Sequence, residues 1–222
     1  MYFQFLAEDQ STKILIDHVM KKIQSNYPEK NILWDIKFFS GIGHLSRKGT
    51  PFQQKTGKLL NDLPMYLRAF DKVLQAMNEG AIFVVLDNDK RDNQEFRRQL
   101  KNIATENMIL SDLVFCIAVK EVEAWLLGDI SAVESAYPNF KRAPQKKYIQ
   151  DGICDTWEVL ADMVYPGGLK KLRKTAGYAY SEIGKAKAEW ADKIGARLNI
   201  ENNRSPSFQF FIRALTQRVE SA

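Results

Sequence analysis

Apolar and polar positions alternate with two different periods along the first half of the chain. Apolar runs of strand length lie at residues 2–7, 32–39, 81–86 and 113–119, and apolar residues at helical spacing follow each run, directly or after a loop. The run at residues 81–86 is apolar throughout, which is typical of a strand buried on both faces of a parallel sheet. The pattern therefore predicts an α/β fold, with a mostly parallel sheet flanked by helices.

The C-terminal third of the chain shows helical periodicity only. Helices are expected at residues 157–164 and 180–198, separated by a Pro-Gly-Gly break at residues 166–168. Ser205 and Pro206 are expected to open a last helix, as an N-cap and a first helical residue.

The helical part is also the basic part of the chain. We expect residues 1–130 to form the α/β core and residues 131–222 to form a helical, basic C-terminal region packed on it. Ten basic side chains stand against five acidic ones from residue 141 to residue 187, so this segment has a net charge of +5, equal to that of the whole chain. Concentrated positive charge is what a phosphate backbone attracts, although a solvated basic face is an equally common reason for it.

Composition excludes several classes of protein. With 222 residues, 45% of them hydrophobic and 27% charged, the chain is of ordinary globular type. No apolar run approaches the roughly 20 residues that span a bilayer, and the N-terminus has no secretory signal, so we expect a cytoplasmic protein without membrane contact. Cys116 and Cys154 belong to no CxxC pair, which argues against a disulfide framework and a thiolate zinc site.

An acidic turn follows the most apolar of the predicted strands. Asp87 and Asp89 come directly after residues 81–86, and in an extended chain two side chains at this spacing leave on the same face. Carboxylates held this close repel one another unless a cation neutralises them, and hard oxygen ligands of this kind suit Mg²⁺ or Mn²⁺. A simple polar turn is the alternative, because Asp and Asn favour turns.

Two other strands end in acids as well. Glu8 follows the first strand, and Glu121 and Glu123 follow the strand at residues 113–119. If the first strand neighbours the one that ends in Asp87, these carboxylates meet at the carboxyl edge of the sheet, where α/β proteins bind ligands. This repeated placement favours a metal site, although for Glu8 a role as an acid at the start of the next helix is equally open.

Other candidate motifs are weaker. The Gly-Ile-Gly-His sequence at residues 41–44 lacks the third glycine of a dinucleotide loop, and with Lys48 it is expected to form a mobile loop near the site. Neither His18 nor His44 is accompanied by a serine or cysteine nucleophile motif, so a triad hydrolase is not expected.

Several segments, in this order, resemble a known family. They are residues 6–12, 83–89, 121–129 and the Ser-Pro-Ser-Phe sequence at residues 205–208 with the amphipathic helix that follows it. These segments look like the motifs of small Toprim-like proteins known as the DUF4276 family, and the Glu-Ala-Trp-Leu-Leu sequence is the most specific of them. The resemblance covers nearly the whole chain and implies a Toprim-like Rossmannoid sheet with a helical C-terminal cap.

The resemblance implies metal-dependent phosphodiester chemistry, as in topoisomerases, primases and nucleases of the overcoming-lysogenization-defect type. Glu8 would take the place of the Toprim glutamate, and Asp87 and Asp89 that of its DxD pair. Glu121 or Glu123 would supply the additional acid of two-metal nucleases. These five acids are the predicted ligands of Mg²⁺ or Mn²⁺, and all of them except Glu121 are also predicted to be catalytic.

A hydrolysis of this kind also needs a cation that offsets charge in the transition state. Lys185 and Lys187 are candidates on one predicted helix, and Lys185 is the one that we predict to be catalytic. A solvated amphipathic helix is an equally good explanation of both. Lys90 and Arg91, directly after the acidic turn, are alternatives.

Two positions depart from the Toprim pattern. Many Toprim proteins have Gly after the glutamate and an acid a few residues later, whereas this chain has Asp9 and Thr12 there, so the number of metal ions stays open. The sequence therefore predicts a metal-dependent nuclease that acts on DNA or RNA, and the resemblance implies an ATPase partner in phage defence. The alternative is a non-catalytic adaptor that binds an ATPase or nucleic acid through its basic C-terminal part. The sequence leaves a homo-oligomer open.

Overall fold

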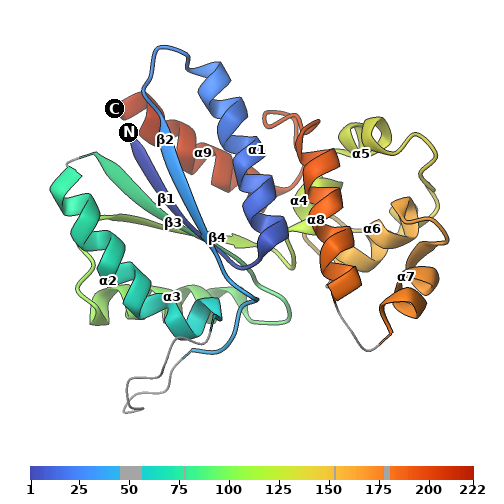
Figure 1. Ribbon diagram of the computed structural model, residues 1–222, viewed down its shortest axis with the longest axis horizontal. Helices are drawn as coiled ribbons and strands as arrows, with labels where there is room; N and C mark the ends of the chain where they lie inside the picture. The colour runs from blue at the N-terminus through green and yellow to red at the C-terminus, as the bar shows by residue number, and fades with distance from the viewer. Residues whose placement is uncertain (46–56, 78, 153, 178–180) are drawn as a thin grey trace.

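The predicted strands form one parallel sheet (Figure 1). The computed structural model describes residues 1–45, 57–77, 79–152, 154–177 and 181–222, and within these residues the sheet has four strands in the order β2-β1-β3-β4, all parallel. The strands are β1 (Tyr2–Ala7), β2 (Leu33–Phe38), β3 (Gly80–Asp87) and β4 (Asp112–Ala118). The predicted α/β architecture is confirmed, and β1 does lie beside β3.

Helices connect the strands and build the C-terminal part. They are α1 (Gln10–Asn26), α2 (Leu59–Met77), α3 (Asn93–Glu106), α4 (Glu123–Leu127), α5 (Ile130–Ala136), the short 3₁₀ helix η1 (Pro144–Lys147), α6 (Thr156–Val164), α7 (Gly168–Ala176), α8 (Ser181–Gly195) and α9 (Pro206–Ser221). Ser205 caps α9 as predicted, because its Oγ accepts a hydrogen bond from the Phe208 N–H. The predicted start of α8 at residue 180 lies outside the described residues. No helix among the described residues has the length and hydrophobicity to cross a membrane.

The helices cover the sheet on two sides (Figure 1). α2 and α3 cover one face, and the side chains of β3 that point to this face, such as Val84 and Leu86, pack against them. α1 and α9 cover the opposite face, to which Phe83 and Val85 point. Because successive side chains of a strand point to opposite faces, a strand covered on both sides has to be apolar along its covered length, as residues 81–86 of β3 are.

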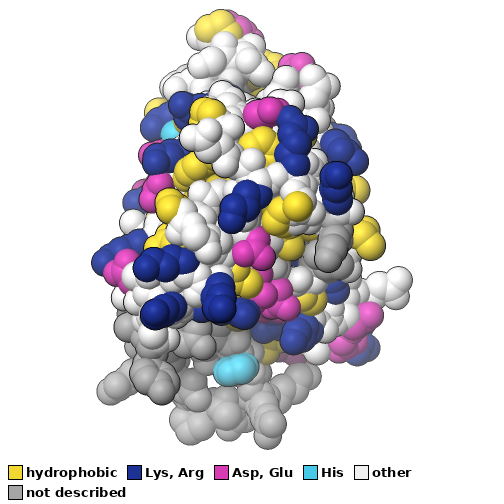
Figure 2. Space-filling model, turned by 90° about the vertical axis from the view of Figure 1, so that its right-hand side faces the viewer, with side chains coloured by type: hydrophobic (Ala, Val, Ile, Leu, Met, Phe, Trp, Pro, Cys, Tyr) yellow, Lys and Arg dark blue, Asp and Glu magenta, His cyan; other side chains and the backbone are white. Residues whose placement is uncertain are grey.

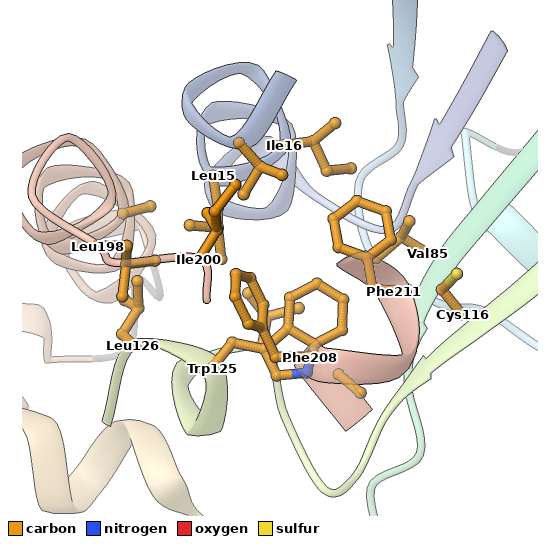
Figure 3. Close-up of a cluster of buried hydrophobic side chains, with 14 of the residues drawn as sticks. Leu15, Ile16, Val85, Cys116, Trp125, Leu126, Leu198, Ile200, Phe208 and Phe211 are labelled. Carbon is orange, nitrogen blue, oxygen red and sulfur yellow. The ribbon is translucent and has the colours of Figure 1, made fainter. Parts of the chain in front are cut away.

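The larger core joins the sheet to the C-terminal helices (Figure 3). Trp125 of α4 and Phe208 and Phe211 of α9 are fully buried, and the Trp125 and Phe211 rings stack with their centroids 5.2 Å apart. The indole Nε1–H of Trp125 donates a hydrogen bond to Ser207 Oγ at 2.9 Å, which satisfies its polar group. Burial of each large side chain contributes roughly 2–3 kcal/mol, so this cluster holds α4 and α9 firmly against the sheet.

The helices α4 to α8 lie beyond the carboxyl ends of the strands (Figure 1). α8 returns to pack against α1, and a Cβ atom added at Gly195 would lie only 3.1 Å from the His18 ring. Nε2 of His18 lies 2.8 Å from Asp192 Oδ1, so this histidine links the two helices. These contacts hold the C-terminal end of α8 against the middle of α1.

Candidate functional site

The parallel pairing of β1 and β3 brings Glu8 next to Asp87. Ala7, the last residue of β1, lies opposite Val85, two residues before the end of β3. Glu8 follows directly, and its Oε2 accepts a hydrogen bond from the backbone N–H of Asp87 at 3.0 Å. The strand order therefore brings these two predicted ligands together at the carboxyl edge of the sheet.

Asp87 is the last residue of β3 and is buried. Its Oδ1 accepts a hydrogen bond from the Val122 N–H at 2.9 Å, in the turn between β4 and α4. The next residue, Asn88, continues the pairing with β4, because its N–H donates to the Ala118 carbonyl at 3.0 Å. One oxygen of Asp87 thus fixes the ends of β3 and β4 relative to one another.

Asp89 has a different geometry. Its φ of +50° lies in the left-handed region, so the extended conformation that we predicted for this turn ends before Asp89. Aspartate tolerates this conformation because its short side chain bonds locally, and here Oδ2 pairs with Arg91 Nη1 at 2.8 Å. Asp89 nevertheless stays near the site, since its charge, after burial and the charge of Asp9, raises the pKa of Glu8.

Glu123 is the first residue of α4 and the most buried of the five predicted acids, with 1% of its surface exposed. Its Oε1 lies 3.1 Å from Nζ of Lys187 on α8. Its Oε2 is buried and has no hydrogen-bond partner among the described residues. Buried polar atoms are nearly always hydrogen-bonded, so this oxygen is suited to receive a cation or an additional donor.

Glu121 is buried as well, but it serves another helix. Its Oε2 accepts hydrogen bonds from Thr156 Oγ1 at 2.7 Å and from the Trp157 N–H at 3.0 Å, in the first two residues of α6. Asp155, which occupies the N-cap position of α6, has a φ of +62° and makes no side-chain cap hydrogen bond. Glu121 therefore caps α6 from the turn after β4, which occupies one of the two oxygens of this predicted metal ligand. The sequence carried no sign of Thr156 in this role.

α8 brings Lys187 to these acids and does not bring Lys185. The Lys187 side chain is 18% exposed and lies against Glu123, whereas the Lys185 side chain is 73% exposed and pairs with an acid of its own helix. Residues two apart on a helix point about 200° away from one another, so both cannot face the site. The prediction of Lys185 as the cation at the site is therefore corrected to Lys187. Its helical spacing to the buried Trp190 was the signal in the sequence.

The alternative cations lie at the turn after β3. The guanidinium of Arg91 pairs with Asp89 and lies 5.0 Å from the centroid of the Phe96 ring, so two contacts hold it in place. Lys90 is exposed to solvent. Lys187 is thus the cation with a direct contact to the buried acids among the described residues.

Burial and mutual repulsion raise the pKa values of the three central acids. Burial raises the pKa of Glu8 from 4.5 to about 7, although the hydrogen bond from the Asp87 N–H opposes the shift. Burial, and then the charge of Glu8, raises the pKa of Asp87 well above its usual value. Burial also raises the pKa of Glu123 to about 7, against the attraction of Lys187. Burial lowers the pKa of Lys187, but the surrounding carboxylates outweigh it and raise that pKa overall.

The two residues that depart from the expected pattern bind each other. Asp9 is the N-cap residue of α1, and its Oδ1 accepts hydrogen bonds from the N–H and from the Oγ1 hydroxyl of Thr12, both at 2.8 Å. Helix capping therefore accounts for this pair, and Glu8 is free to point toward Asp87. Lys48, which we expected in a loop near the site, lies outside the described residues.

The comparison with known families covers the whole of this site. Residues 7–216 match the family described as "Domain of unknown function (DUF4276)". This chain belongs to the DUF4276 family. The match runs from the end of β1 into α9, so it includes the five predicted acids and Lys187. No curated protein and no solved structure matches this DUF4276 chain.

The donor atoms of this DUF4276 protein suit a hard divalent cation. Glu8, Asp87 and Glu123 offer carboxylate oxygens, and the unpartnered Oε2 of Glu123 fits a cation. Among the described residues, however, no three acidic, histidine or cysteine side chains are placed to hold a metal ion as they stand. The ammonium of Lys187 lies beside Glu123 instead. Metal binding therefore requires Lys187 to move away and the carboxylates to turn toward one another.

Acidic side chains lie near the middle of the molecular face toward which the strands point, with lysine and arginine side chains around them (Figure 2). On the same side of this DUF4276 protein, α7 exposes Lys170, Lys171 and Lys174. Arg173 of the same helix pairs with Glu158. Asp87, Glu121 and Glu123 are buried, so most of the acidic surface in this view belongs to other residues. The exposed lysines of α7 are side chains that can attract phosphate groups.

Proposed function

We propose that this protein is a Toprim-like, metal-dependent nuclease that hydrolyses phosphodiester bonds of DNA or RNA in the cytoplasm. The observation that carries the proposal is the cluster of Glu8, Asp87 and Glu123, which follow or end three neighbouring strands and have raised pKa values. Carboxylates that repel one another in a poorly solvated place cost stability, and such arrangements concentrate at functional sites.

The chemistry follows from these residues. Bound Mg²⁺ or Mn²⁺ supplies Lewis-acid polarisation of a phosphoryl oxygen and lowers the pKa of bound water. Glu8, Asp87 and Glu123 would hold the ion, with Asp89 at the exposed rim of the site. Lys187, once separated from Glu123, would offset the negative charge that builds up on the phosphate. The low local polarity strengthens each of these electrostatic interactions.

The exposed lysines of α7 support a nucleic-acid substrate. Lys170, Lys171 and Lys174 are on the surface, and the described part of α7 contains no acidic residue. Contacts of this kind position a phosphate backbone without reading its sequence. We therefore expect binding that weakens steeply as the salt concentration rises.

A cleavage assay tests the nuclease. Purified protein is incubated with Mg²⁺ or Mn²⁺ and with single- and double-stranded DNA and RNA. We expect cleavage by the wild type and a loss of about a hundredfold or more in Asp87→Asn, which removes a charge from the proposed ligand set. Glu182→Gln changes an exposed carboxylate on α8 and should cleave like the wild type. Equal cleavage by Asp87→Asn and wild type would contradict the mechanism.

A non-catalytic adaptor is the second candidate, and one observation favours it. The Lys187 ammonium already neutralises part of the acidic cluster without a metal ion. Such a protein would bind an ATPase partner or nucleic acid through its basic C-terminal part, in a phage-defence complex. Isothermal titration calorimetry with MnCl₂ separates the two functions. A nuclease binds Mn²⁺ at millimolar concentration or below and loses this binding in Asp87→Asn, whereas the folded adaptor shows no binding.

A further inference from the structure

β4 leaves one of its edges without a partner strand. It is the last strand of the sheet order, and the carbonyl of Ala118 accepts a hydrogen bond from Asn88, beyond the end of β3. Backbone groups of alternate residues point to opposite edges of a strand, so Leu113, Phe115 and Ile117 direct their N–H and C=O groups away from β3. Within the described residues no other strand pairs with this edge.

The two outer edges of the sheet differ in their side chains. β2, at the opposite edge, carries the exposed charged residues Asp35 and Lys37. β4 has no charged residue from Leu113 to Ala118. Charged side chains are the usual protection of an edge strand against pairing with another chain. From Leu113 to Ala118, β4 lacks this protection.

A groove follows the open edge of β4. It has a volume of about 870 Å³ and lies between α3 on one face of the sheet and α9 on the other, with the first half of β4 along its floor. Phe210 of α9 lines the groove and is 38% exposed. Leu110, which directly precedes the groove residue Ser111, is 78% exposed. Large apolar side chains exposed beside an unpaired edge are typical of a protein interaction surface.

The walls of the groove are positively charged. Arg97 and Lys101 of α3 both line it, and neither forms an ion pair with a described residue. Arg97 places its guanidinium 5.8 Å from the centroid of the Phe210 ring. The single carboxylate in the lining, Asp112, is already paired with Arg218 of α9. The groove therefore offers two cations to an acidic occupant.

We propose that this groove binds an extended segment of a partner protein, in which apolar residues alternate with acidic ones, as an added strand on β4. The outward backbone groups of β4 would pair with the segment. Its apolar side chains would point to the α9 side and cover Phe210, and its carboxylates would point to the α3 side and contact Arg97 and Lys101. A second copy of the chain fits less well. Antiparallel pairing of two β4 strands would place α3 beside its own copy, with Arg97 and Lys101 facing like charges.

Selection from a displayed library of random linear peptides tests the proposal, with the full-length protein as bait. We expect enriched sequences that alternate apolar residues with Asp or Glu. A synthetic peptide of the enriched sequence should bind at least about tenfold more weakly to the double variant Arg97→Glu, Lys101→Glu. Arg98→Glu is the matched control, because Arg98 lies on α3 outside the groove and pairs with Glu95 there.

A second comparison tests the strand pairing itself. The enriched peptide is also made in two N-methylated forms, one with methyl groups on the odd-numbered residues and one with them on the even-numbered residues. One form should not bind, because its methyl groups replace the N–H groups that donate to β4. The proposal is overturned if no peptide is enriched over an empty-bait selection, or if the peptide binds equally to the double variant and the wild type. It is also overturned if sedimentation velocity shows a dimer that excludes the peptide and that forms equally well in the double variant.

Discussion

Glu8→Gln should stabilise the metal-free protein while it removes nuclease activity. The glutamine keeps an oxygen that can accept the hydrogen bond from the Asp87 N–H, and it removes the negative charge that burial and the neighbouring acids disfavour. A substitution in a well-adapted structural site rarely increases stability, so a gain here is specific to an electrostatically strained functional site.

The size and sign of this effect follow from the pKa of Glu8, which burial raises from 4.5 to about 7. The folded protein therefore holds this proton to a higher pH than the unfolded chain does. Stability is retained at low pH and falls as the pH rises from about 4.5 to about 7. Each pKa unit corresponds to about 1.4 kcal/mol, so the stability that the charge of Glu8 can remove is at most roughly 3 kcal/mol. Because Glu8 keeps part of its surface in solvent, we expect Glu8→Gln to gain about 2 kcal/mol at pH near 8.

Urea unfolding of both proteins in chelator-treated buffer, at about pH 5 and about pH 8, measures this difference. The free energy of unfolding of the wild type should fall from about pH 5 to about pH 8, and that of Glu8→Gln should fall less. At the lower pH the two proteins should have nearly equal free energies of unfolding. Glu182→Gln makes the same chemical change at an exposed site and should follow the wild type. A variant that is less stable than the wild type at pH near 8, or that keeps the full pH dependence, would refute the reasoning.

Three further predictions concern the same region. Lys187→Met should lower the free energy of unfolding by about 3 kcal/mol at pH near 8, because it leaves Glu123 buried without its cation. The loss should be smaller at pH near 5, where Glu123 is protonated. Lys185→Met, measured alongside by urea unfolding, should lower the free energy of unfolding by less than about 0.5 kcal/mol. Glu121→Ala should lower the free energy of unfolding by about 1–2 kcal/mol, because α6 loses its cap. The affinity for Mn²⁺, measured by calorimetry, should stay unchanged. A tenfold weaker affinity would instead show that Glu121 is a ligand. Mn²⁺ at about 100 times its Kd should add roughly 2.7 kcal/mol to the stability of the wild type and nothing to Asp87→Asn; equal shifts in thermal unfolding would show that the ion binds elsewhere.

The sheet could be predicted from the sequence because β1, β3 and β4 consist mainly of apolar residues, and in β2 apolar residues alternate with Asp35 and Lys37. β1 has the predicted bounds, and β3 extends the predicted run at 81–86 by one residue at each end. The elements that escaped prediction are short. α5 has 7 residues, which are too few turns for a helical period to stand out from its surroundings. α7 has 9 residues, as many as the predicted α6, so its length does not explain why it was missed.

The site was predictable only as far as strand order determines it. Glu8 and Asp87 meet because β1 and β3 are parallel neighbours, and acids at parallel strand ends share one edge of the sheet. The role of Glu121 was not accessible in this way, because its partner Thr156 is 35 residues away and arrives with a helix whose position depends on tertiary packing. Asp89 departs from the expected geometry because one left-handed residue is enough to turn a side chain away from the strand.

The opposite signs expected for Glu8 and Lys187 identify the source of the strain. If the cluster were an ordinary buried ion-pair network, removing any member would destabilise the protein, because every charge would be matched. Here Glu8, Asp87 and Glu123 together exceed the single charge of Lys187, so removing an acid should relieve repulsion and removing the lysine should increase it. A packing defect would give losses in both variants and no dependence on pH. Gain in one, loss in the other, and convergence at low pH would indicate buried negative charge that Lys187 offsets only in part, which is the property that a divalent cation would satisfy.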